Sequence, residues 1–326
     1  MPANPAARRL LLLAGAVLLA LLLAGLVTGA IGAAFLGREP LLSKPEVHLA
    51  PQPVTGVSGE ASGEHGEGPA GLPSGFVLTN TLLSSWIATV LLLLFFFFAT
   101  RRMSLVPGGL QNFAEWVVET LHNFVQGVVG PEYGRRFFPM IATIFLFVAV
   151  NAWLELLPIY QSLGFKNADG ELSTHLLRAA ATDLNMPLAI ALVSFVFVEY
   201  WGLRAHGTRY LGEFFRVSSF WHGIRRFSPG LLFQGAIDIF VGLLEFLSHG
   251  IRVISFTFRL FGNITAGEIL LLVAGFLVPF VALLPFYGLE LLVGFIQALI
   301  FAGLTLGFVA VAVAPHEGEG HSEERG

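Results

Sequence analysis

Long apolar stretches alternate with polar segments along the chain, and this pattern predicts a polytopic membrane protein built from α-helices. Each stretch approaches or exceeds the roughly 20 residues with which a helix crosses a bilayer. The six predicted spans occupy residues 10–36, 77–99, 137–158, 186–201, 231–274 and 286–314. We therefore expect an all-α fold with about six hydrophobic spans.

The two C-terminal spans are unusually long. Residues 231–274 exceed one upright crossing, which predicts either a strongly tilted helix or two helices. Because proline removes a backbone donor and breaks helices, Leu284 and Pro285 mark the expected turn before the final helix. In 108–130, apolar residues recur at helical spacing among polar ones, which predicts an amphipathic helix at the membrane interface.

The N-terminal Leu/Ala run has two interpretations. Residues 10–36 follow Arg8 and Arg9 and are long for the apolar region of a signal peptide, so we favour a retained anchor over cleavage near 28–34. The Pro, Gly, Ser and Glu of the next segment cannot bury a core. The predicted organisation is an anchor or signal segment at 1–36, an acidic extracytoplasmic linker at 37–76, a membrane domain at 77–314 and an acidic tail at 315–326.

Arginines in the loops predict the orientation, because Lys and Arg are enriched on the cytoplasmic side. Arg101 and Arg102 end the second span, and five arginines lie in the loop 204–230. Counting six crossings from a cytoplasmic N-terminus places both loops and the C-terminus inside.

Composition supports the membrane class and excludes several chemistries. The 326 residues are 55% hydrophobic and 12% charged, against the roughly 25% charged of a soluble domain. There is no cysteine, which excludes disulfides and thiolate sites. The chain lacks both a phosphate-binding glycine motif and a basic tract with interleaved aromatics, so we expect no nucleotide or nucleic-acid site of its own. We expect no metal or other cofactor; His316 and His321 stand in the acidic tail, where a solvated segment is the simpler interpretation.

Permanent charges inside an apolar helix are the strongest functional signal. Arg252 and Arg259 lie within the fifth span, and such residues usually face a protein interior or a water-filled path. At about 100° per residue, one polar stripe runs along this helix, and it contains Glu245, Ser248, Arg252, Ser255, Arg259 and Asn263, with His249 beside it. An ion path is the favoured interpretation, and pairing of these charges for helix packing is the alternative.

Two carboxylates near the outer ends of the last two helices extend this hypothesis. Glu268 and Glu290 could share protons if they lie close together, since neighbouring carboxylates perturb one another. The alternative is two independent carboxylates facing water. Gln297 lies seven residues after Glu290 on the same helical face.

The run RLFGNITAGEILLLV at 259–273 resembles the signature of subunit a of F-type ATP synthases, the stator channel beside the rotating ring. The resemblance extends over about 77–314 through PGGLQNFAEWVVE at 107–119, FFPMIATIFLFVAVNAWLELLP at 137–158 and ATDLNMPLAIAL at 181–192. It matches Arg259 to the family's essential arginine, and Glu245, Asn263, Glu268 and Gln297 to polar channel positions. Glu290 stands where many members have His, which is a departure from the family pattern.

The resemblance implies a non-catalytic membrane subunit that passes an ion, expected to be a proton rather than Na⁺, to and from ring carboxylates. It implies an outer half-channel with Asn263, Glu268 and Glu290, and an inner one with Glu245, Ser248 and His249. The implied partners are the c-ring, the subunit b peripheral stalk and the soluble F1 ATPase sector, in the lipid bilayer of a bacterial inner membrane. A secondary transporter would instead show inverted repeats, of which the sequence has none, and a passive anchor would leave Arg259 without a role.

Overall fold

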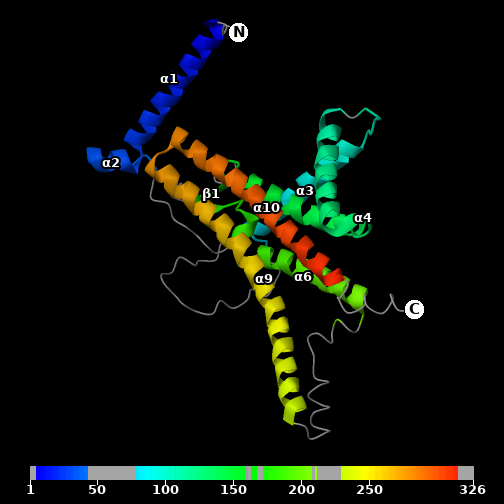
Figure 1. The fold of residues 1–326 in the computed structure, drawn as a ribbon. Helices are drawn as coiled ribbons and strands as arrows, with labels where there is room; N and C mark the ends of the chain where they lie inside the picture. Colours follow the sequence, from blue (N-terminus) through cyan, green and yellow to red (C-terminus); the bar gives the residue numbers. More distant parts are fainter. Residues whose placement is uncertain are drawn as a thin grey trace. The chain divides into compact units, whose positions relative to one another are not determined.

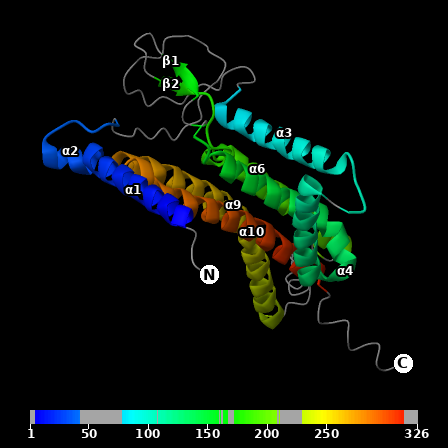
Figure 2. The ribbon, with the colours of Figure 1, turned by 90° about the horizontal axis from the view of Figure 1, so that it is seen from above.

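Six membrane-length helices dominate the computed structural model, which describes residues 5–42, 78–106, 108–158, 160, 163–166, 172–207, 210 and 229–314. The expected fold class is confirmed, since within these residues six helices are long and apolar enough to cross a membrane. The described residues depart from an all-α fold at a short antiparallel hairpin of β1 (Gly164–Lys166) and β2 (Leu172–His175), which Figure 2 shows. In this hairpin, Gly164 pairs with His175. Most of the predicted linker, the loop 204–230 and the acidic tail lie outside the described residues.

The N-terminal run forms two helices, α1 (Pro5–Thr28) and α2 (Ala30–Leu36), which are interrupted at Gly29. The side chains of α1 are mostly exposed, as expected of a helix that faces lipid. Its C-terminal end approaches the turn that follows α9 so closely that a Cβ at Gly25 would meet the carbonyl of Pro279 (Figure 1). Glycine is therefore required there for the close backbone approach.

The second span and the predicted amphipathic helix are both helical. Helix α3 covers Asn80–Thr100, and α4 runs from Gly109 to Leu154 with a break at Gly130, whose φ of 78° and ψ of 171° are not helical. Pro131 follows directly at the start of the second half, a position that tolerates a missing N–H. The predicted helix 108–130 and the third span are thus the two halves of α4. The third span ends at Leu154 rather than at residue 158, because residues 155–158 form turns.

The C-terminal half contains α6 (Asn185–His206), α9 (Pro229–Leu277) and α10 (Leu284–Val313), and the short 3₁₀ helices η1 (Ala180–Thr182) and η2 (Phe280–Leu283) precede α6 and α10. Of the two alternatives for 231–274, one continuous helix is observed (Figure 1). The turn expected at Leu284 and Pro285 lies earlier, at 278–283. Pro285 instead occupies the first turn of α10, where the absent N–H breaks no helical hydrogen bond.

The chain forms two compact units. The first contains residues 1–88, 149–183 and 261–296, and the second contains 89–148, 184–260 and 297–326. Aromatic packing stabilises the second unit, where Phe137 contacts Trp201 at 5.0 Å between ring centroids and Phe256 contacts Phe301 at 4.8 Å. In the first unit, the indole of Trp153 donates a hydrogen bond to the carbonyl of Leu291 at 3.1 Å and joins α4 to α10.

Candidate functional site

Arg259 projects from α9 in the second unit and is exposed, although its neighbours Phe256 and Leu260 are buried. The helix continues through this position because no proline interrupts residues 230–277. The guanidinium carbon lies 5.7 Å from the ring centroid of Phe256, within range of a cation–π contact. Among the described residues, no carboxylate forms an ion pair with Arg259.

The two amide side chains of the predicted path lie on different helices. Asn263 follows Arg259 by one turn of α9 and is half-buried, within the first unit. Gln297 belongs to the second unit on α10 and is only 5% exposed. Its amide nitrogen is buried without a hydrogen-bond acceptor in the described part of the chain. A buried donor of this kind is costly unless water or another molecule reaches it.

Glu268 forms an ion pair in the first unit. Its Oε2 lies 3.4 Å from a guanidinium nitrogen of Arg178, and the Arg178 side chain is only 9% exposed whereas that of Glu268 is 27% exposed. The backbone N–H of Arg178 donates to the hydroxyl of Ser84 on α3 at 3.2 Å. This hydrogen bond ties the segment before η1 to α3.

Tyr160 belongs to the same network, through a hydrogen bond to Ser84. Burial raises the pKa of the Tyr160 phenol above its ordinary value. The phenol therefore stays neutral at physiological pH and acts as a hydrogen-bonding group rather than a charge.

Glu290 lies beside Glu268 in the first unit and is more deeply buried. It is 4% exposed, and its carboxylate contacts Gly267 so closely that a Cβ at that position would collide with it. Its Oε1 is buried and has no hydrogen-bond donor within the described residues. Glu155, directly after α4, interacts electrostatically with both carboxylates. We call Glu155, Arg178, Glu268 and Glu290 the carboxylate cluster.

A second set of charges lies on α6 and α9 in the second unit. Nδ1 of His249 and Oε1 of Glu199 are 2.6 Å apart, and the two side chains are 13% and 19% exposed. The ring of Phe195 meets the imidazole edge to face at 6.4 Å between centroids. We call His249 and Glu199 the His–Glu pair. Of the other predicted inner residues, Glu245 is half-buried and Ser248 is exposed.

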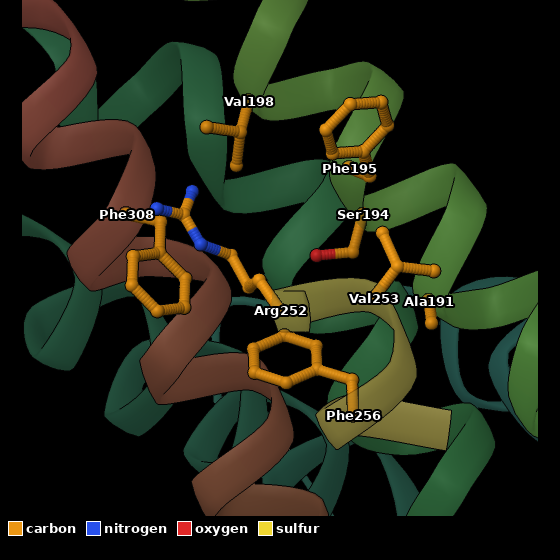
Figure 3. Close-up of a pocket in the computed structure, with 8 residues that line it drawn as sticks. All are labelled: Ala191, Ser194, Phe195, Val198, Arg252, Val253, Phe256 and Phe308. Carbon is orange, nitrogen blue, oxygen red and sulfur yellow. The ribbon is translucent and has the colours of Figure 1, made fainter. Parts of the chain in front are cut away.

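Arg252 lies one turn after the His–Glu pair, at a small pocket between α6, α9 and α10. Figure 3 shows its side chain reaching toward Phe308, and the guanidinium carbon is 3.7 Å from that ring centroid. Glu199 and Glu245 both attract this guanidinium. The pocket is lined by Ala191, Ser194, Phe195, Val198, Arg252, Val253, Phe256 and Phe308. The hydroxyl of Ser194 on α6 also shares a hydrogen bond of 2.7 Å with the hydroxyl of Thr305 on α10.

Comparison with known proteins identifies the family. The family described as ATP synthase A chain matches residues 82–310. The chain is 32% identical to ATP synthase subunit a of Gloeobacter violaceus over 286 residues, which cover 87% of this chain and 97% of that protein. It is 34% identical to ATP synthase subunit a 3 of Pelobacter propionicus over 225 residues, 69% of this chain and 83% of the relative. The chain belongs to the ATP synthase subunit a family. The resemblance noted in the sequence is thereby confirmed.

In this member of the family, the structure brings some predicted residues together and adds three that the sequence did not single out, Glu155, Arg178 and Glu199. Glu268 and Glu290 both interact electrostatically with Glu155, and His249 has a carboxylate partner. The hypothesis of a shared outer path stays a prediction. Arg178 was missed because it belongs to an irregular loop. Glu199 was missed as well, although an ionisable residue inside a span is itself a functional signal.

Proposed function

We propose that this chain is the proton-translocating stator subunit of a bacterial F-type ATP synthase. Its task is to pass protons between the two sides of the membrane and the carboxylates of a rotating ring. Each proton that crosses 100 mV releases about 2.3 kcal/mol, and a path that is interrupted between its two ends converts this free energy into rotation.

The observation that carries the proposal is Arg259, an exposed guanidinium on a membrane-length helix with no carboxylate partner among the described residues. An arginine at mid-membrane costs at least about 2.5 kcal/mol on insertion scales, so it needs an anionic group nearby. A guanidinium keeps its proton at physiological pH. It therefore acts as a fixed positive charge that attracts an ionised ring carboxylate and prevents protons from passing directly between the two paths.

The polar groups on either side of Arg259 supply the two half-channels. Asn263, Glu268 and Glu290 serve the outer one, where the carboxylates accept incoming protons. Glu245, Ser248 and His249 serve the inner one, and Gln297 offers a buried amide donor.

The remaining parts of the complex follow from this role. The c-ring supplies the moving carboxylates, the subunit b stalk holds this chain against rotation, and the soluble F1 sector carries the nucleotide chemistry. The chain itself is non-catalytic and multi-pass, in the inner membrane. A secondary transporter is not favoured, because its paired repeats are absent from the sequence.

Reconstitution tests this function. The complete complex and a complex prepared without this chain are placed in proteoliposomes, and proton uptake on adding ATP is recorded with a pH-sensitive dye. We expect uptake only when the chain is present, while soluble ATPase activity persists in both preparations. Equal proton uptake without the chain would contradict the proposal.

A further inference from the structure

The His–Glu pair is more than a packing contact. A distance of 2.6 Å between Nδ1 of His249 and Oε1 of Glu199 is that of a strong, charge-assisted hydrogen bond. The two residues are 50 positions apart and come from different helices, α6 and α9. Both side chains are largely buried within membrane-length helices, where an ionisable group is costly unless it has a function or a partner.

We infer that Glu199 is a positioning residue for proton transfer at His249, and that the two act as one unit of the inner half-channel. This inference deepens the proposed function and rests on it. Because Glu199 accepts the hydrogen of Nδ1, the neutral imidazole carries its lone pair on Nε2. The hydrogen bond therefore fixes which ring nitrogen takes up a proton.

The proton balance is simple. Nε2 of neutral His249 accepts one proton from the water of the inner path, and the pair becomes an imidazolium beside a carboxylate. The Nδ1–H hydrogen bond to Glu199 is retained throughout. Nε2 then releases the proton to the next water molecule of the inner path. The pair thereby regains its starting state, with a net charge of −1.

The surrounding charges favour this assignment of roles. On α9, Glu245 and Arg252 lie one turn on either side of His249, and Arg252 is attracted by Glu199, Glu245 and Tyr210. Glu199 thus interacts with Arg252 as well as with His249. Phe195 of α6 packs edge to face on the imidazole, and Phe308 of α10 packs on Arg252. In the proposed step, Glu199 orients the imidazole and His249 exchanges the proton.

The test uses four variants of the whole complex in proteoliposomes with the soluble sector facing outward. They are Glu199→Gln, His249→Gln, the double variant, and the exchange of Glu199→His with His249→Glu. Rates of ATP-driven proton uptake are measured at outside pH 5.5 to 8.5 and divided by the wild-type rate at the same pH, so that the pH response of the soluble sector cancels.

We expect each single variant to lower proton uptake about tenfold, the order of one charge-assisted hydrogen bond. The double variant should be no slower than His249→Gln, because Glu199 acts only through His249. The exchanged pair should recover at least a third of the wild-type rate. The relative rate of Glu199→Gln should also change with pH, whereas a purely structural defect lowers it by one factor at every pH.

Controls separate this inference from protein loss and from failure of the proposed function. Glu132→Gln removes a carboxylate that is 76% exposed and should leave uptake unchanged. Glu199→Asp replaces Glu199→Gln if the latter does not assemble, and its rate should lie between wild type and His249→Gln. Wild-type rates in Glu199→Gln or in Glu199→Asp, or additive losses in the double variant, would overturn the inference. If the wild-type complex itself takes up no protons, the proposed function fails instead.

Discussion

The carboxylate cluster and the His–Glu pair both gather ionisable side chains next to an arginine, but the groups that they contain differ. In the first unit, Glu155 interacts electrostatically with Glu268 and Glu290, and Arg178 pairs with Glu268 at 3.4 Å. In the second unit, one carboxylate pairs with a histidine at 2.6 Å, and Arg252 rests on the ring of Phe308. The first region is rich in acid groups, whereas the second contains the imidazole.

The two regions share one feature despite this difference. Each contains a fixed guanidinium that accompanies one carboxylate, Glu268 in the first unit and Glu199 in the second. Each region also contains a second ionisable group, Glu290 in the first unit and His249 in the second. We propose that these two groups exchange protons, while the arginine in each region keeps its own proton and supplies a permanent charge.

Within these two regions, the largest effect is expected from removing both outer carboxylates. Glu268→Gln and Glu290→Gln should each slow ATP-driven proton uptake, and the double variant should nearly abolish it, by about tenfold or more. The loss should be greater for Glu290→Gln than for Glu268→Gln, because Arg178 already neutralises Glu268. Uptake by inverted vesicles provides the measurement, with the exposed pair Glu119→Gln and Glu132→Gln as the control. Wild-type uptake in the double variant would remove both residues from the path.

A smaller loss should follow when the outer cation is removed. Arg178→Met leaves Glu268 without its partner beside two other acids, so we expect uptake to fall about three- to tenfold. Combining it with Glu268→Gln should restore part of the rate, since the unpaired charge is then absent. Arg136→Met is a matched control, because Arg136 is 51% exposed and its partner lies 3.8 Å away on the same helix. A double variant slower than Arg178→Met would show that this pairing is unimportant.

The smallest effect is expected at the contact between α9 and α10. Gly267→Ala places a methyl group against the carboxylate of Glu290. The end of that side chain can shift, so we expect only about a two- to threefold slowing. Gly275→Ala on the same helix meets Leu283 at an ordinary 3.6 Å and should behave as wild type. Equal rates for both glycine variants would indicate that the place of the Glu290 carboxylate is unimportant.

Much of the fold could be predicted because membrane-length apolar runs specify helices directly. The length of residues 231–274 was compatible with either one helix or two, and the structure shows one continuous helix, α9. The position of the last turn could not be predicted, because Pro279 and Pro285 give the same local signal. The packing of Gly25 and Gly29 against Pro279 and its neighbours distinguishes the two prolines.

The candidate functional groups could be predicted where one helix carries them all. They could not be predicted where a tertiary contact brings distant positions together. Spacing alone put Arg259 and Asn263 on one face. The ion pair of Arg178 with Glu268 joins residues 90 positions apart, and the His–Glu pair joins residues 50 apart. No helical period relates such positions, so one sequence contains no signal for either pair beyond the presence of the charges.

Arg259 is the residue on which the account depends most, since we propose that it separates the two paths. The most direct measurement is proton flux in vesicles with an imposed potential, together with ATP-driven uptake, for Arg259→Ala and Arg259→Lys. We expect Arg259→Ala to stop uptake and to raise passive leakage, because the fixed charge between two intact paths is lost. Arg259→Lys keeps a charge on an ammonium that deprotonates more readily on burial, so leakage should be small and uptake badly impaired. Normal ATP-driven uptake in Arg259→Ala vesicles would contradict the account.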